Sequence, residues 1–301
     1  MSTTVVAYLA ANLSELIPGR QYVSSTFGLD HELIVLSVRK PDYEKDPLPA
    51  PPFSYAVHKL STSGWQVVLS MPLDEKRFRF VQPLPGDRWL LVEARMDKRN
   101  TPNAFVYSKR GELIGSFVAG DAIEHVQTTR NGEVWIGYFD EGACSGGDLE
   151  QSGLVCFDET GRPLLQYWPD IAEPNSLPCI DDCYALNVSA DDVWACYYSS
   201  FPLVRLRSRR LEQAWVDWPG KAVRSFAVHN ERMLMVAAYR DGLLYSVHLQ
   251  ERTLYEVSIS GPDGEPLQFD TSFSRGPLLC FASLKDPLNQ KLFMVDLRTI
   301  P

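Results

Sequence analysis

The chain has 301 residues, of which 45% are apolar, so it is long enough to bury a large core. Its formal net charge of −9 disfavours a nucleic-acid binder, because phosphate contacts need a cationic face. The first twenty residues have no basic start before their short apolar run and no stretch long enough to span a bilayer. We therefore expect a cytoplasmic protein that contacts no membrane and keeps its six cysteines reduced.

A short apolar segment of about seven residues, which we call the repeated phrase, recurs along the chain. Polar turn residues precede each copy, and most copies end with a charged residue. Successive copies begin 40 to 59 residues apart. The copies are Leu33 to Arg39, Trp89 to Arg95, Trp135 to Glu141, Trp194 to Ser200, Leu234 to Arg240 and Leu279 to Lys285. A repeat of this size that is built only of strands is typical of propeller blades.

Each phrase has the same neighbours, which fixes the order of strands within a repeat. A mixed apolar and polar strand precedes it, and a third and usually a fourth strand follow through hairpin signals. This order predicts an all-β, six-bladed β-propeller of four-stranded antiparallel blades, with strands A to D running from the axis outward. The whole chain, 1–301, would form one domain, with approximate blades 20–71, 77–118, 123–168, 183–217, 222–260 and 266–298 plus 3–9.

The sixth repeat ends before a fourth strand, because only four residues follow Lys291 to Leu297. The β-branched run Thr3 to Leu9 precedes the first repeat and offers a strand. We expect this N-terminal strand to close the last blade, which protects sheet edges that an open array would leave unpaired.

This organisation resembles six-bladed propellers of the NHL and regucalcin-like kind. The stretch from Trp135 to Leu203 also looks like a motif of uncharacterised bacterial propellers. The resemblance implies the fold. We place no counterpart of the Glu, Asn and Asp side chains that hold a divalent metal in regucalcin-like lactonases, so it implies no activity.

Acidic residues gather in the third and fourth blades. Between Asn131 and Val204 there are thirteen Asp or Glu residues and one base, Arg162. Two long loops should open on one face of the disc, the loop after strand B of blade three and the loop before strand A of blade four. The expected partner-binding residues in and beside them are Asp140, Glu141, Asp148, Glu150, Asp170, Glu173, Asp181, Asp182, Tyr198 and Phe201.

Crowded like charges are relieved by a cation or a basic partner, and Tyr and Trp are enriched at interfaces. We expect a non-catalytic protein, monomeric on its own, that binds another protein with a basic surface. An inhibitor or immunity protein that occludes a basic toxin or enzyme fits this description. Solvated acidic loops without a binding role remain the plain structural alternative.

Two further hypotheses remain open. A metal-dependent small-molecule hydrolase, similar to a lactonase, would use Asp140, Asp181, Asp182 and His125 at the channel mouth. A sensor would hold an anion on the charged residues that end the repeated phrases, namely Arg39, Arg95, Arg240 and Lys285. No serine-hydrolase elbow, P-loop, His-Glu-x-x-His or Cys-x-x-Cys motif occurs, so we expect no cofactor and no metal.

Overall fold

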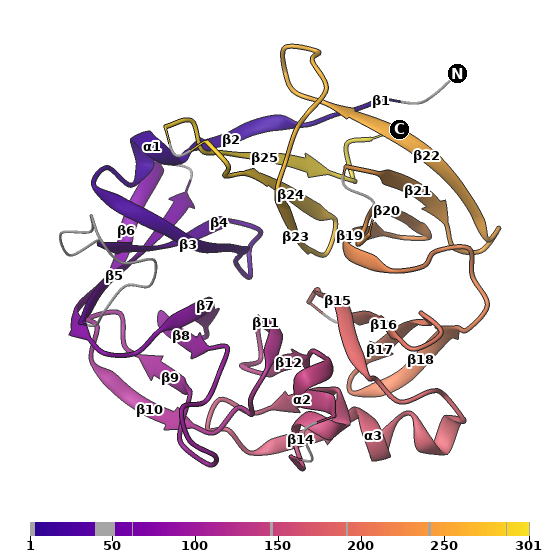
Figure 1. Cartoon of the computed structure of the whole chain (residues 1–301), viewed down its shortest axis with the longest axis horizontal. Coiled ribbons are helices and arrows are strands. Elements are labelled where there is room, and N and C mark those ends of the chain that lie inside the picture. Colours follow the sequence, from indigo (N-terminus) through magenta and orange to yellow (C-terminus); the bar gives the residue numbers. More distant parts are fainter. Residues whose placement is uncertain are drawn as a thin grey trace.

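The computed structural model describes residues 4–39, 52–61, 63–144, 147–190, 192–239, 242–286 and 288–300. Its strands form six sheets that stand as blades around a common axis (Figure 1). This arrangement confirms the six-bladed propeller of four-stranded antiparallel blades. Among the described residues, no helix has the length and apolar character needed to cross a lipid bilayer.

The first three blades are regular meanders in which each strand pairs with the next. Blade one contains β3 (Arg20–Phe27), β4 (Leu33–Arg39), β5 (Phe53–Ser61) and β6 (Gly64–Asp74). Blade two contains β7 (Phe78–Leu84), β8 (Arg88–Glu93), β9 (Ala104–Tyr107) and β10 (Leu113–Phe117). Blade three contains β11 (Ile123–Thr128), β12 (Val134–Tyr138), β13 (Leu154–Phe157) and β14 (Pro163–Gln166).

The last three blades continue the order around the ring. Blade four contains β15 (Asp182–Val188), β16 (Asp192–Tyr198), β17 (Leu203–Arg207) and β18 (Arg210–Trp215). Blade five contains β19 (Val223–His229), β20 (Arg232–Ala237), β21 (Leu244–His248) and β22 (Thr253–Ser260). Blade six contains β23 (Thr271–Arg275), β24 (Leu278–Ser283) and β25 (Lys291–Asp296).

The N-terminal segment closes the ring, as expected, but it does so over two blades. Strand β2 (Tyr8–Asn12) pairs antiparallel with β25 and is the fourth strand of blade six. Strand β1 (Thr4–Val6) pairs parallel with β22 and adds a fifth strand to blade five. The segment therefore divides at Ala7, which is fully buried and packs with Val5 in the apolar layer between these two blades.

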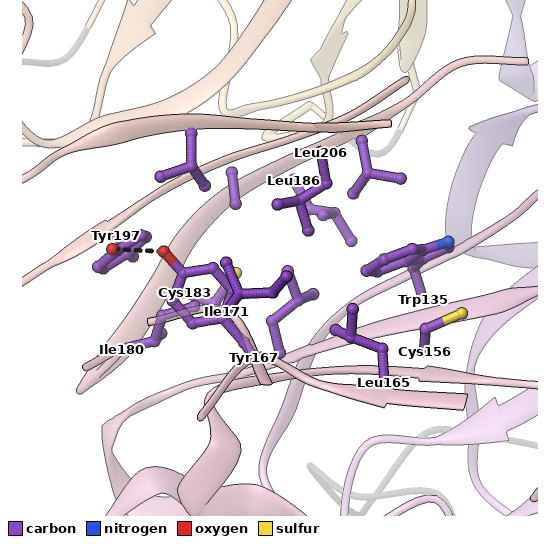
Figure 2. Close-up of a cluster of buried hydrophobic side chains, with 14 of the residues drawn as sticks. Trp135, Cys156, Leu165, Tyr167, Ile171, Ile180, Cys183, Leu186, Tyr197 and Leu206 are labelled. Carbon is purple, nitrogen blue, oxygen red and sulfur yellow. Dashed lines mark hydrogen bonds between the residues drawn. The ribbon is translucent and has the colours of Figure 1, made fainter. Parts of the chain in front are cut away.

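Apolar side chains pack between neighbouring blades and form the core. The layer between blades three and four contains Trp135, Leu165, Tyr167, Leu186 and Tyr197, all less than 5% exposed (Figure 2). The hydroxyls of Tyr167 and Tyr197 lie 2.7 Å apart inside this layer, and the Tyr197 hydroxyl also donates to the Pro178 carbonyl at 3.1 Å. Buried hydroxyls are costly without partners, so these bonds make the polar ends of both rings compatible with the apolar layer.

Short helical turns lie in the connections between strands, where the sequence pattern predicted only loops. Helix α1 (Leu13–Leu16) follows β2, and α2 (Asp140–Ala143) and the 3-10 turn η1 (Glu150–Ser152) lie between β12 and β13. Helix α3 (Tyr167–Asp170) and the 3-10 turn η2 (Glu173–Asn175) lie between β14 and β15. The phrase from Trp135 to Glu141 was expected to be one strand, but the strand ends at Tyr138 and helix α2 begins at Asp140.

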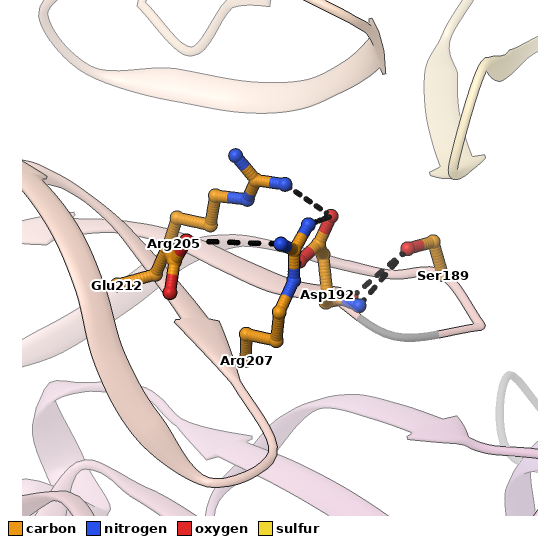
Figure 3. Close-up of polar contacts among 5 residues, drawn as sticks. All are labelled: Ser189, Asp192, Arg205, Arg207 and Glu212. Atoms are coloured by element: carbon orange, nitrogen blue, oxygen red, sulfur yellow. Dashed lines mark hydrogen bonds and ion pairs between the residues drawn. The ribbon is translucent and has the colours of Figure 1, made fainter.

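A partly buried ionic cluster stabilises the face of blade four opposite these helical turns. Asp192 accepts from Arg205 at 2.8 Å and from Arg207 at 2.9 Å, and Ser189 binds the Asp192 backbone (Figure 3). Burial alone would raise the pKa of Asp192, yet the hydrogen bonds and charges of the two arginines hold it below its ordinary value. The cluster joins the A–B turn to strand C of this blade.

Candidate functional site

The two acidic loops are neighbours on one face of the disc, which we call the loop face. It carries the connections from strand B to strand C and from strand D to the next strand A. Helix α2 contacts β15, and α3 contacts η1, so the loop of blade three and the loop before blade four touch (Figure 1). Gly153 lies at φ +68°, and a Cβ there would stand 2.2 Å from the Cβ of Ile180. The absence of a side chain at Gly153 thus allows this close approach.

Asp182 has the most perturbed carboxyl in these loops. Burial, followed by the negative charges of Asp140 and Glu124, raises its pKa from 3.8 to about 6. Asp182 begins β15 in blade four, whereas Asp140 and Glu124 belong to blade three. The three acids therefore meet across the boundary between blades, and a cation placed among them would relieve their repulsion.

The remaining acids of the expected site differ in exposure. Five of them are exposed on the loop face, namely Asp140, Glu141, Asp148, Asp170 and Glu173, and Asp181 is half-buried. Glu150 is only 6% exposed and accepts the Asp121 backbone N–H at 2.7 Å. Its carboxylate fixes the loop from the inside and is not part of the exposed surface.

Two exposed and two half-buried aromatic rings lie beside the acids and form what we call the aromatic cluster. The exposed rings are Tyr198 and Tyr239, and the half-buried rings are Tyr184 and Phe201. Phe201 packs edge-on against Tyr184 at 5.2 Å and Tyr198 at 5.5 Å between ring centroids. Tyr239, from the neighbouring blade, packs edge-on against Tyr184 at 5.8 Å. Tyr198 is nevertheless 47% exposed and Tyr239 72% exposed.

Backbone conformation and side-chain contacts hold the aromatic cluster in place. Ser200 and Phe201 have φ values of +64° and +50°, in the left-handed region that costs non-glycine residues about 1 kcal/mol or more each. The Trp218 indole N–H donates to the Phe201 carbonyl at 2.7 Å and supports this turn. Sequence reasoning expected Tyr198 and Phe201 but missed Tyr184 and Tyr239. The repeat could have identified both residues, because Tyr184 lies at the start of strand A and Tyr239 follows strand B of the next blade. Both of these positions belong to the loop face.

Two of the four residues of the expected anion-binding rim form ion pairs with carboxylates of the same chain. Arg95 forms ion pairs with Glu141 and, at 3.2 Å, with Asp121. Lys285 pairs with Asp270 at 3.2 Å. Arg39 is exposed at the end of β4, and Arg240 lies outside the described residues.

Thiols and carboxylates near these loops form no metal cluster. Cys144 and Cys179 are exposed free thiols, and Cys183 is a buried free thiol. Across the described ranges, no group of three or more His, Cys, Asp or Glu side chains could hold a metal ion. His125, a candidate of the hydrolase hypothesis, instead lines the axial cavity.

The axial cavity has a volume of about 1000 Å³ and is lined mainly by the innermost strand of each blade. It reaches the loop face, where Arg95 and Phe139 contribute to its wall. At the other end, side chains bond across the axis. Arg275 of blade six donates to Gln82 of blade two at 3.1 Å and to the Thr128 carbonyl of blade three at 2.8 Å.

Two amides complete this closure. Gln127 of blade three donates to the carbonyls of Leu186 at 3.1 Å and Ser274 at 3.0 Å, in blades four and six. Asn187 of blade four donates to the Phe226 carbonyl of blade five at 2.6 Å and accepts from the Gly276 N–H at 2.6 Å. Because these bonds join opposite sides of the ring, the channel is a cup with a polar floor and a mouth on the loop face.

The profile of the YxzG family matches residues 154–289. No curated protein matches the chain in sequence. A functionally unknown protein from Desulfotomaculum acetoxidans DSM 771 is similar in structure, with a TM-score of 0.54 at 11% identity over 93% of this chain and 84% of that one. Kluyveromyces lactis Hsv2 gives a TM-score of 0.53 at 10% identity over 92% and 75% of the two chains. At these identities the likeness shows a shared propeller fold.

Proposed function

We propose that this protein binds another protein through the part of the loop face formed by blades three, four and five. The observation that carries the proposal is the placement of the repelling acids Asp140 and Asp182 beside the aromatic cluster, in which Tyr198 and Tyr239 are exposed. The propeller provides a rigid support for these loops, as it does in many protein-binding members of this fold.

The charge of this surface specifies the partner. Asp140, Asp148, Asp170 and Glu173 are exposed there, and a basic surface would pair with them, whereas Glu141 already pairs with Arg95. Such complementarity speeds encounter and discourages wrong partners, and it weakens at high salt. The raised pKa of Asp182 adds a reason for affinity, because a partner's Lys or Arg would replace carboxylate repulsion with attraction.

The aromatic cluster supplies the apolar part of such an interface. Tyr198 and Tyr239 are large rings that stay exposed while being held by their neighbours. Rigid aromatic side chains lose little conformational entropy on binding and are common among residues that dominate binding energy. Acidic loops around an aromatic centre suit an inhibitor or immunity protein that occludes a basic toxin or enzyme.

Affinity capture from the native host, followed by calorimetry with the purified basic protein that is captured, tests the proposal. Asp140→Asn combined with Asp182→Asn should weaken binding about tenfold or more and should flatten its salt dependence. Tyr198→Ala combined with Tyr239→Ala should weaken binding by a similar factor or more without changing the salt dependence.

Matched control variants lie away from the loop face. Glu251→Gln removes an exposed acid in the turn between β21 and β22, and Tyr255→Ala removes a ring that is 64% exposed on β22. Both controls should bind as the unmodified protein does. Equal affinity of the loop-face variants and the controls for the captured protein would refute the proposal.

A further inference from the structure

We propose that the axial cup is a binding site for a small hydroxylated organic anion, a site separate from the protein-binding surface. The proposal rests on the charges and unpartnered polar atoms of the cup. It does not depend on the proposed protein partner.

Three guanidinium groups that lie in or directly beneath the cup have no carboxylate partner among the residues that the structure describes. Arg79 of blade two donates to the Val23 carbonyl at 3.4 Å, and Arg224 of blade five donates to the carbonyls of Asp270 and Ala238 at 3.3 and 3.1 Å. Within the described parts of the chain, neither of them forms an ion pair, and Arg275 in the floor forms none either. These arginines differ from the rim cations expected from the sequence.

Arg275 is the most unusual of the three. It is 3% exposed, its partners Gln82 and Thr128 are neutral, and its Nε has no hydrogen-bond partner. Burial lowers the pKa of Arg275 to about 10, so the guanidinium still carries its charge at neutral pH. The negative charge of Glu32 partly opposes this shift, but Glu32 forms its ion pair with Lys59, and among the described residues no carboxylate pairs with Arg275. A buried cation without a paired counterion is costly, and an anion seated on the floor of the cup would offset that cost.

The acids of the cup leave this positive charge available. The Asp270 carboxylate accepts the backbone N–H groups of Leu284 at 2.6 Å and Lys285 at 2.9 Å, and it also pairs with the Lys285 ammonium. Glu124 is exposed and lies at the wall of the cup, and its charge raises the pKa of Asp182. The floor, where Arg275 lies, is therefore the positive end of the cup.

Polar atoms without partners specify that the ligand also carries hydroxyl groups. Ser24 Oγ, Ser274 Oγ and His125 Nε2 are buried, belong to residues that line the cup and make no hydrogen bond to any described residue. Burial lowers the pKa of His125 and thereby favours the neutral ring, which bears one donor and one acceptor nitrogen. Hydroxyl groups both donate and accept, and they would satisfy serine and neutral histidine together.

Isothermal titration of the full chain with small probes tests this site. Glycerol 3-phosphate and glycerate place a phosphate or a carboxylate on the same hydroxylated three-carbon frame, and glycerol lacks the charge. At least one of the two anions should bind saturably and more tightly than glycerol. The anion with the higher affinity identifies the anionic group that the site prefers. If neither anion binds more tightly than glycerol, the proposal is wrong.

Variants of the cup and of the outer surface locate the binding. Arg224→Gln and Arg79→Gln should each weaken anion binding about tenfold, the loss expected for one charge-assisted hydrogen bond. Arg110→Gln removes an exposed arginine in the turn between β9 and β10 and should leave the affinity unchanged. Ser274→Ala should weaken binding without lowering thermal stability, since its hydroxyl has no partner in the free protein. If Arg110→Gln weakens binding as much as the cup variants do, the anion binds elsewhere and the proposal is refuted.

Discussion

Replacing Asp182 with Asn should stabilise the protein at neutral pH. The folded state holds this carboxyl half-buried near Asp140 and Glu124, which raises its pKa from 3.8 to about 6. An ionised Asp182 therefore opposes folding, and Asn keeps the shape of the side chain without its charge. A folded-state pKa this far above the unfolded value corresponds to a ceiling of about 3 kcal/mol. Partial exposure screens the charges, and we expect a gain of about 1 kcal/mol.

The pH dependence of this gain has a definite sign. Below pH 3.8 Asp182 is protonated in both the folded and the unfolded state, so the variant and the unmodified protein should differ little. Between pH 3.8 and about 6 the unfolded state loses its proton first, and the stability of the unmodified protein falls relative to the variant. Above pH 6 the difference should be constant.

Urea unfolding of both proteins at pH 4, 5, 6 and 7.5 measures this difference. Glu173→Gln is the control, because Glu173 is an exposed acid on the same face and its neutralisation should change the unfolding free energy by less than about 0.5 kcal/mol. Asp140→Asn should reproduce part of the gain, and the double variant should gain less than the sum of the two single changes. A variant that is less stable than the unmodified protein at pH 7.5, or equally stable across the whole series, would refute the electrostatic reasoning.

Three further changes test other parts of the fold. Gly153→Ala should destabilise the protein by about 3 kcal/mol or more in urea unfolding, since it combines left-handed backbone strain with a clash against Ile180. The control Gly19→Ala has the same φ of +68° but open space around it, and it should cost only about 1 kcal/mol. Asp192→Asn should lower the free energy of unfolding by about 1–3 kcal/mol at pH 7, because it removes the charge that pairs with the arginines. Since folding lowers the pKa of Asp192, this destabilisation should shrink below pH 3.8. A destabilisation that is constant with pH would contradict the electrostatic role of Asp192. Deleting residues 1–12 should expose the edges of β22 and β25, lower the melting temperature and cause self-association by light scattering, whereas a monomer of unchanged stability would show that closure is dispensable.

The sequence was sufficient for the architecture because its signal is local and repeated. Trp89 and Trp194 each begin a buried strand phrase, and an alternation of strands and turns needs no long-range information. The position of the acidic loops followed from the same repeat, since antiparallel order decides which connections share a face. Glu150 was misjudged as a surface residue because its burial depends on a hydrogen bond to Asp121 in a different connection.

The contents of the cup could not be predicted from the repeat. Gln127, Asn187 and Arg275 belong to three different blades and lie 60 or more residues apart in the sequence. Their bonds across the axis therefore depend on ring closure. In the sequence each of them is simply a polar residue at the end of an inner strand. The same is true of Arg224, whose lack of an acidic partner among the described residues is visible only in three dimensions.

The pairing of β2 with β25 also imposes an order of events during synthesis. Strand β2 is translated long before β25, so it has no partner strand until nearly all of the six blades have been made. Blades one to five can assemble while translation continues, but the final seam forms only after β25 has left the ribosome. During that interval β2 must remain out of competing pairings, which makes the nascent chain a target for chaperones that shield exposed strands.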